Sequence, residues 1–488
     1  MPSTDLPLQG KKLGLVSSFL SGVGLTLAFP PLNLSFLAYL VFIPLIIFSK
    51  ERPFLSGLVF GLGHLTTLLY WIMFVIVPPP TKRWLIFGVV VLIIYLSLYY
   101  GVLGVGLKHL GPISLPFLIV VLEFIRSQGE IGFPWGLIGY TQVQYLPVLQ
   151  LSSLFGIYGL SFFVGSVNLL VYYMIRKRDY YLITIPIVVV ISGLLMLGRS
   201  DHTDLKLGIL QPNIDTNIVW GRNQREETMR MLIAETESLA QDGVDLIIWP
   251  ESMLPFMIFH HKDYLRLIES VADSHSVAIF IGTGIMERKD GYHLYNGAVL
   301  IKSDSGISGI YRKVHLVPFS EHIPYEEKFR FLQKVRFGQS NYHPGDTLPI
   351  FDVGKRFGGL ICFESIFPEL SRSYLENGAD FLINITNDGW FGRSPGPYQH
   401  AQMAVVRAVE FRIPLVRCAN NGISMVVDPY GRVVKKTALF EKTKILAFLP
   451  EGMGDSLYSK IGDIIVLISA IFLIILTGRP FLLRYRRR

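Results

Sequence analysis

Three side chains in the second half of the chain have types and positions that suit nucleophilic catalysis. The first, Cys362, ends a short apolar run, residues 358–361, and precedes a helix-like segment, residues 367–377. A thiol between a strand and the start of a helix has its pKa lowered by the helix N–H groups, so we expect a reactive thiolate here. The alternative is an inert, buried cysteine, which is the commoner role of a single free cysteine.

The other two side chains are an acid and an amine. Glu251 follows a buried-type strand, residues 246–249, in the sequence LIIWPES. Desolvation at a strand end raises a carboxyl pKa towards the range of a general base. Lys313 lies with Glu321 in the aromatic segment 310–324, IYRKVHLVPFSEHIP. Taken singly, Glu251 is more often a surface acid at a turn, and the lysine segment suits a solvated connection equally well.

Residues 204–457 must position these side chains, and their composition differs from that of the rest of the chain. This part is polar and mixed, and short apolar runs alternate with amphipathic stretches. Such alternation of strands and helices predicts α/β layers. The expected strands are residues 205–210, 246–249, 277–282, 296–301, 309–311, 358–361, 381–385, 415–418 and 424–427, and the expected helices are residues 222–241, 264–274, 367–377 and 399–411.

The remainder of the chain has the composition of a membrane protein. Of the 488 residues, 51% are apolar and 17% are charged, and the mean hydropathy is +0.44. A bilayer-spanning helix needs about 20 apolar residues, and several apolar segments reach that length. We therefore expect a membrane α-helical bundle of about eight transmembrane helices, at residues 11–29, 34–48, 54–77, 84–107, 113–125, 153–175, 180–197 and 461–477.

Basic residues fall on alternate ends of successive apolar segments, apart from one pair, Lys82 and Arg83. Because basic loops stay in the cytoplasm, this distribution places the α/β part on the outer side of the membrane. The expected domains are a transmembrane domain at 1–200, a catalytic domain at 201–458, and a final helix with a basic tail at 459–488. The net charge of +8 is then mainly a topology signal, and we expect no nucleic-acid partner.

An ionisable pair, Glu123 and Arg126, lies near the end of one apolar segment. Charged side chains in a membrane segment are costly unless they pair, so the two are candidates for substrate binding. An ion pair that only fixes the helix end explains them equally well. No zinc-type spacing of Cys and His occurs in the sequence, and the two cysteines, Cys362 and Cys418, cannot form a disulfide framework, so we expect neither a metal nor a cofactor.

Considered together, the three chemical motifs carry a resemblance that none carries alone. A strand ending in WPE, then YRKVHLVPFSE, then a strand ending in CFES, about 50 to 60 residues apart, resemble the nitrilase superfamily. That resemblance implies an αββα sandwich with a Glu-Lys-Cys triad, here Glu251, Lys313 and Cys362. Residues 410–433 are similar to the superfamily's C-terminal signature, which assigns Cys418 to a core strand.

The membrane segments extend the resemblance to the apolipoprotein N-acyltransferase family. FPWGLIGYTQ, GIYGLSF, HLVPFSEHIP and NDGWFG are similar to stretches of that family. The resemblance implies a bacterial inner-membrane enzyme whose catalytic domain is periplasmic. It would transfer an acyl chain from a phospholipid, through a cysteine thioester, to the N-terminal amino group of a diacylglyceryl-modified apolipoprotein.

The resemblance also assigns roles to individual residues. Glu251 would be the general base, Lys313 would stabilise the oxyanion, and Cys362 would be the nucleophile. Supporting positions are Glu321, Glu364 and Phe363, the last standing where tyrosine is common, and Trp220 resembles a substrate-cleft position. Two alternatives stay open at this point: a membrane-tethered amidase or hydrolase, and a transporter with a non-catalytic enzyme-like domain.

Overall fold

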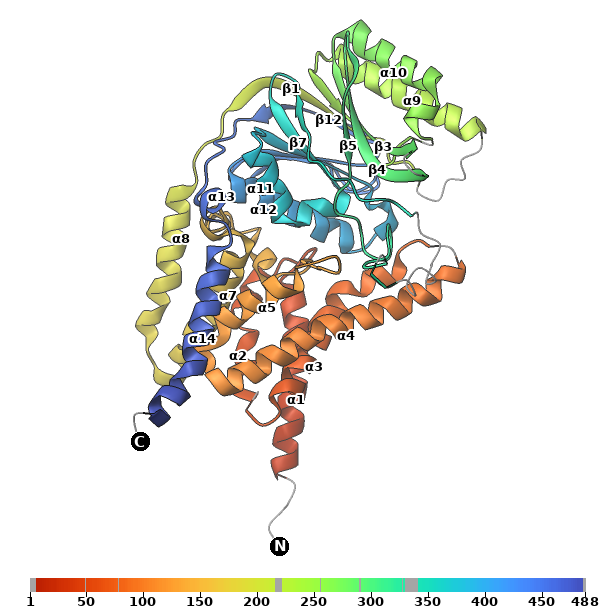
Figure 1. Cartoon of the computed structure of the whole chain (residues 1–488). Helices are drawn as coiled ribbons and strands as arrows, with labels where there is room; N and C mark the ends of the chain where they lie inside the picture. The colour runs from red at the N-terminus through yellow and green to blue at the C-terminus, as the bar shows by residue number, and fades with distance from the viewer. Residues whose placement is uncertain are drawn as a thin grey trace. The chain divides into compact units, whose positions relative to one another are not determined.

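The computed structural model describes residues 6–48, 50–77, 79–215, 222–254, 256–288, 291–326, 328–329 and 341–485. Its internal contacts divide the chain into two units (Figure 1). One is helical and combines Met1–Leu197 with Ser456–Arg488, and the other is an α/β unit, Gly198–Asp455.

Each of the eight predicted membrane segments contains helix. A helix satisfies its backbone hydrogen bonds within one segment, which is why apolar segments of this kind adopt it. Within the residues that the structure describes, three helices are long and apolar enough to cross a membrane, Pro53–Phe74, Thr81–Leu110 and Ser152–Lys177, while four more are apolar but shorter. The α-helices of this unit are α1 Leu6–Leu27, α2 Phe42–Phe48, α3 Pro53–Leu69, α4 Pro79–Leu110, α5 Leu115–Arg126, α6 Leu146–Leu149, α7 Ser152–Lys177, α8 Thr184–Met196, α13 Leu457–Ile461 and α14 Ile464–Tyr485.

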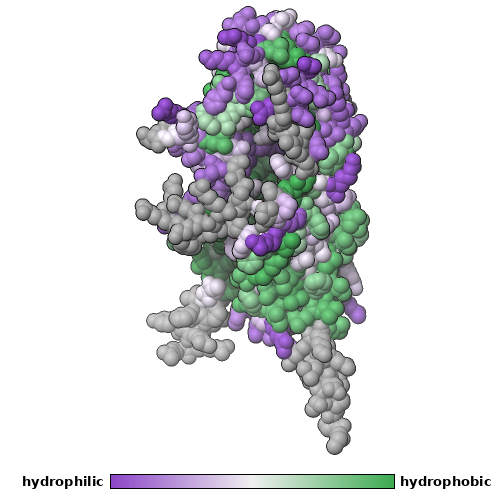
Figure 2. Space-filling view, turned by 90° about the vertical axis from the view of Figure 1, so that its right-hand side faces the viewer, coloured by the Kyte–Doolittle hydropathy of each residue, from purple (hydrophilic) through white to green (hydrophobic). Residues whose placement is uncertain are grey.

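The helical unit presents apolar side chains on its outside and small residues at its closest helix contacts. On the face that Figure 2 shows, hydrophobic side chains gather over the helical unit, whereas the α/β unit is mainly hydrophilic. On α4, for example, Phe87 is 62% exposed. A Cβ added at Gly57 of α3 would lie 1.9 Å from the Tyr100 carbonyl oxygen of α4. Close approach at glycine and an apolar exterior are typical of helices that pack in lipid.

In the described part of the α/β unit the strands form two six-stranded sheets with the orders β12-β1-β2-β3-β4-β5 and β11-β10-β9-β8-β7-β6. In each sheet three central strands are parallel, β1-β2-β3 and β7-β8-β9, and antiparallel strands complete the edges. The strands are β1 His202–Gln211, β2 Leu246–Ile248, β3 Ala278–Arg288, β4 Tyr292–Lys302, β5 Gly306–Arg312, β6 Ile350–Asp352, β7 Arg356–Ile361, β8 Phe381–Thr386, β9 Leu415–Ala419, β10 Met425–Val427, β11 Val433–Lys436 and β12 Thr443–Pro450.

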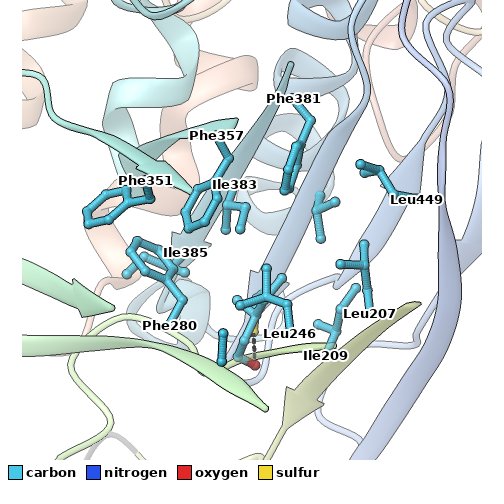
Figure 3. Packing of buried hydrophobic residues seen from close by; sticks show 14 of the residues in the cluster. Leu207, Ile209, Leu246, Phe280, Phe351, Phe357, Phe381, Ile383, Ile385 and Leu449 are labelled. Atoms are coloured by element: carbon cyan, nitrogen blue, oxygen red, sulfur yellow. Dashed lines mark hydrogen bonds between the residues drawn. The ribbon is translucent and has the colours of Figure 1, made fainter. Parts of the chain in front are cut away.

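The two sheets face each other across one apolar core. Phe280 from the first sheet packs against Phe351 and Phe357 from the second (Figure 3). Side chains alternate between the faces of a strand, and β7 shows this directly. A Cβ at Gly359 would point at Phe280 in the core, whereas a Cβ at Gly358 would point at Tyr374, on the opposite face.

Helices cover the outer face of each sheet. The first sheet packs against α9 Arg222–Gln241 and α10 Lys262–His275, and the second packs against α11 Pro368–Glu376 and α12 Gly396–Phe411. The four layers are therefore helix, sheet, sheet and helix (Figure 1). The predicted α/β sandwich is confirmed, and the number of helices that cross a membrane stays a prediction.

Candidate active site

The candidate residues follow the ends of strands from both sheets of the α/β unit. Glu251 comes just after β2, Cys362 directly after β7, and Lys313 directly after β5. The carboxyl ends of parallel strands meet at one edge of a sheet, which is where binding and catalytic groups gather in α/β folds. In this unit the two sheets face each other, so groups from both reach one place.

Lys313 lies between two carboxylates. Its Nζ is 2.8 Å from Glu321 Oε2 and 4.0 Å from Glu251 Oε1, and its side chain is fully buried. The Asn296 amide joins the two acids, because Nδ2 donates to Glu251 Oε1 at 2.8 Å and to Glu321 Oε1 at 2.9 Å. The Asn387 N–H donates to Glu251 Oε2 at 3.0 Å. A buried ammonium is thus held in one position by ion pairs and hydrogen bonds.

The surroundings shift the pKa values of Glu251 and Glu321 in opposite directions. Burial raises the pKa of Glu251, although the Lys313 charge opposes the shift. Burial acts on Glu321 too, but the Lys313 charge and the hydrogen bonds outweigh it and hold the pKa of that carboxyl below its usual range. For Lys313 itself, burial is outweighed by Glu321 and Glu251, which raise the pKa of the amine. Lys313 stays charged and Glu321 stays ionised, so Glu251 is the acid suited to exchange a proton.

Cys362 begins a short 3-10 turn, Cys362–Ile366, with a left-handed φ of +53°. Cys362 as a whole residue is half-buried. Burial of the sulfur, followed by the Glu251 charge, raises its pKa above the usual range, and Lys313 only partly offsets this. The prediction of a lowered thiol pKa is therefore wrong, because α11 begins only at Pro368 and the desolvated site favours the neutral thiol. A protonated thiol needs a base, and Glu251 is near enough to act on it electrostatically.

Glu364 links the lysine segment to the turn that carries Cys362. Its Oε1 accepts from Tyr311 OH at 2.7 Å, from the Val314 N–H at 2.9 Å and from the His315 N–H at 3.0 Å. Its Oε2 accepts from the Ile361 N–H at 2.7 Å. Burial raises the pKa of Glu364 to about 7. The carboxyl group therefore positions both chain segments.

The remaining predicted positions of the α/β unit lie as follows. Phe363 is buried and its ring lies 5.1 Å from Phe367 and 6.1 Å from His315. Trp220 lies outside the residues that the structure describes. Cys418 is in β9, where its Sγ lies 3.3 Å from the carbonyl oxygens of two core strands. Its position in the core agrees with the strand assignment.

Glu123 and Arg126 belong to the helical unit. Both are buried on α5, with Arg126 Nη2 3.9 Å from Glu123 Oε1. Arg126 Nη2 donates to the Gly136 carbonyl at 3.0 Å, and the Ile138 N–H donates to Glu123 Oε1 at 2.6 Å. A cavity of about 20 Å³ beside them has room for about one water molecule. These contacts fit an ion pair that holds the following loop, and substrate binding by the pair stays a prediction.

Sequence reasoning missed several polar residues of the site. Asn296 is buried within apolar β4, and a lone amide in such a strand is the signal that would have indicated a site. Asp388, His400 and Arg417 form a second buried network beside the Cys362 backbone. Asp388 lies in the NDGWFG motif that the sequence analysis quoted without deriving a role for it.

Two family models match the chain. The carbon-nitrogen hydrolase model covers residues 206–454, and the apolipoprotein N-acyltransferase N-terminal domain model covers residues 21–170. A solved amidase from Nesterenkonia sp. AN1 is similar over 52% of this chain and 94% of its own, at 17% identity and a TM-score of 0.39.

Similar proteins of known name match over nearly the whole length. The apolipoprotein N-acyltransferase of Geobacter metallireducens is 36% identical in an alignment 476 positions long, which covers 91% of this chain and 91% of that protein. The apolipoprotein N-acyltransferase of Rickettsia prowazekii is 33% identical over 86% of this chain and 88% of its own. The chain belongs to the apolipoprotein N-acyltransferase family.

Proposed function

We propose that this protein transfers an acyl chain from a phospholipid to the N-terminal amino group of a diacylglyceryl-modified apolipoprotein, with Cys362 as the carrier. The observation that carries the proposal is the buried Lys313 ammonium held between Glu251 and Glu321, close enough to the half-buried Cys362 to interact with it electrostatically. A base, a fixed positive charge and a nucleophile are the groups that acyl transfer through a covalent intermediate requires.

In the first half-reaction Glu251 takes the Sγ proton and the sulfur attacks the ester carbonyl of the phospholipid. The carbonyl oxygen becomes an oxyanion, which the Lys313 ammonium stabilises. The bond from the carbonyl carbon to the glycerol oxygen then breaks. Glu251 returns its proton to that oxygen, so a lysophospholipid leaves and a thioester remains on Cys362.

In the second half-reaction the α-amino group of the diacylglyceryl-cysteine attacks the thioester. Glu251 takes a proton from the attacking nitrogen, the C–S bond breaks, and Glu251 passes that proton to the leaving sulfur, which restores the thiol of Cys362. The raised pKa of Glu251 suits both directions of proton transfer, because a general acid–base group works best when its pKa is near the operating pH. The low pKa of Glu321 keeps that acid ionised as the partner of Lys313.

The helical unit is proposed to hold the enzyme in the membrane from which both substrates come. In this proposal the eight apolar segments cross the bacterial inner membrane, within a transmembrane domain at 1–200 and a final helix with its tail at 459–488. Residues 201–458 form the catalytic domain on the periplasmic side. Basic residues at alternate segment ends support this orientation.

A hydrolase that releases fatty acid to water uses the same triad chemistry, so the acceptor must be tested directly. Purified protein is incubated with a phospholipid labelled in its acyl chain, with and without a diacylated peptide that has a free N-terminal cysteine amine. We expect label on the peptide amine, lysophospholipid in equal amount, and neither product with Cys362→Ala. Free fatty acid with unlabelled peptide would favour the hydrolase and contradict the proposal.

A further inference from the structure

The carbonyl group of the nucleophile itself is the focus of a buried network that the proposed mechanism does not use. Three side chains lie within hydrogen-bond distance of the Cys362 carbonyl oxygen. They are Ser365 Oγ at 3.0 Å, His400 Nε2 at 3.1 Å and Asn384 Nδ2 at 3.3 Å. All three side chains are fully buried.

Cys362 has an unfavourable backbone conformation, which these hydrogen bonds help to hold. Its φ of +53° lies in the left-handed region, which is unfavourable for a residue with a side chain. A conformation of that kind persists only when its surroundings hold it in place. The side-chain donors on the carbonyl fix the peptide plane that follows Cys362, and therefore fix the direction in which the sulfur points.

His400 is itself held by charged partners. Its Nδ1 lies 2.9 Å from Asp388 Oδ1 and 3.0 Å from Arg417 Nη2, and Arg417 Nη2 donates to Asp388 Oδ2 at 2.8 Å. A carbonyl oxygen only accepts, so Nε2 carries the hydrogen that faces Cys362. Burial, then the Arg417 charge, holds the pKa of His400 below its usual range, so the ring is neutral. Nδ1 then carries no hydrogen and accepts from Arg417, and Asp388 acts on the ring through its ion pair with Arg417.

We propose that His400, oriented by Arg417, which Asp388 holds in place, is a positioning residue that holds the Cys362 carbonyl and thereby aims the sulfur at the acyl ester. The inference rests on the proposed function, since it assigns the network a part in thioester formation. This role requires no contact between His400, Asp388 or Arg417 and the reacting atoms. The network acts through the backbone of the nucleophile.

The test compares His400→Ala with the conservative variant His400→Gln in full-length protein. The Gln side-chain amide can replace Nε2 as a donor to the Cys362 carbonyl, whereas Ala removes the donor. Thioester formation on Cys362 is followed by rapid quenching and intact mass, over a range of phospholipid concentrations. A nucleophile displaced by about 1 Å loses up to roughly 100-fold in rate. We expect a loss of about 10- to 100-fold in the maximal rate for Ala, with KM for phospholipid unchanged, and a loss of under about threefold for Gln.

Asp428→Ala is the matched control for a structural effect. Asp428, like His400, is a buried side chain that hydrogen-bonds to the backbone, but it lies outside the network. It accepts from the N–H groups of Tyr430 and Arg432 in a different loop. We expect this variant to lower Tm and leave the rate of thioester formation unchanged. If His400→Ala yields too little folded protein, Ser365→Ala removes one donor with a smaller change. It is expected to slow acylation roughly 3- to 10-fold, the effect of one hydrogen bond.

The outcomes separate the positioning role from the proposed function. Wild-type protein that forms no thioester would overturn the proposed function and this inference with it. Wild-type protein that acylates, together with His400→Ala or Ser365→Ala at the same rate, would overturn the positioning role alone. A Gln variant as slow as the Ala variant, with wild-type Tm, would also overturn it, because the restored donor would then have no effect.

Discussion

Replacing Lys313 by methionine tests the electrostatic core of the site. Methionine has a similar length and fills the buried space, so the change removes the charge and opens no large cavity. Lys313 Nζ lies 2.8 Å from Glu321 and 4.0 Å from Glu251, so both acids lose their cation. Two consequences follow: the oxyanion loses its donor, and both carboxyl groups lose a charge that lowers their pKa.

The two consequences have different pH dependences. Loss of one oxyanion donor costs about 10²- to 10³-fold in rate, or about 3 to 4 kcal/mol, at any pH. The second effect raises the pKa of Glu251 further, so a larger share of the base is protonated at a given pH, and activity increases as the pH rises. We therefore expect Lys313→Met to lose more than about 10³-fold near neutral pH and to recover only in part at high pH.

The assay is the rate of thioester formation on Cys362 from phospholipid, measured by rapid quenching and intact mass across pH. Lys442→Met is the control, since its Nζ forms an ion pair of 2.8 Å with Glu235 and its side chain is 50% exposed. That variant should match wild type, because exposed pairs contribute little. Wild-type rates in Lys313→Met would refute the role of the lysine. Complete recovery at high pH would refute oxyanion stabilisation and leave only the effect on pKa.

Three further predictions concern other residues of the site. Glu251→Gln should lower the rate of thioester formation by about 10²- to 10⁴-fold while phospholipid still binds, and unchanged kinetics would exclude it as the base. Gly282→Ala places a Cβ 2.6 Å from both the Glu251 Cα and the Pro250 carbonyl oxygen. This contact should displace Glu251 and lower the rate of thioester formation roughly 100-fold, and a normal rate would contradict that packing. Burial raises the pKa of Glu364 from 4.5 to about 7, so its stabilising contribution is complete below about pH 4.5 and is lost as the pH rises through 7. The Tm of wild type should fall over that interval and that of Glu364→Gln should fall less, and an equal fall in both would contradict the assignment.

The sequence predicted the α/β part well because its local signals agree. Short apolar runs that alternate with amphipathic helices can bury both faces of a sheet only in a layered structure, and residues such as Phe280 and Phe357 form its core. Short apolar runs that stop just before Glu251 and Cys362 placed these two residues at strand ends, which the structure shows as the ends of β2 and β7. These features depend on neighbours within about ten residues.

Properties that depend on contacts between distant segments could not be predicted from the sequence. The pKa of Cys362 is set by burial and by Glu251, 111 positions earlier in the chain, and the helix start that was expected to lower it lies too far on. Asn296 bridges two acids that come from different loops. His400 reaches the Cys362 carbonyl from α12, a contact that no spacing in the sequence indicates.

The most direct measurement of the central claim is the mass of the protein after incubation with phospholipid alone. The account predicts an increment of one acyl chain, located on the peptide that contains Cys362, released by hydroxylamine and absent from Cys362→Ala. An increment on Cys418, or one that persists in Cys362→Ala, would contradict it, and so would a protein that transfers acyl chains without ever carrying one.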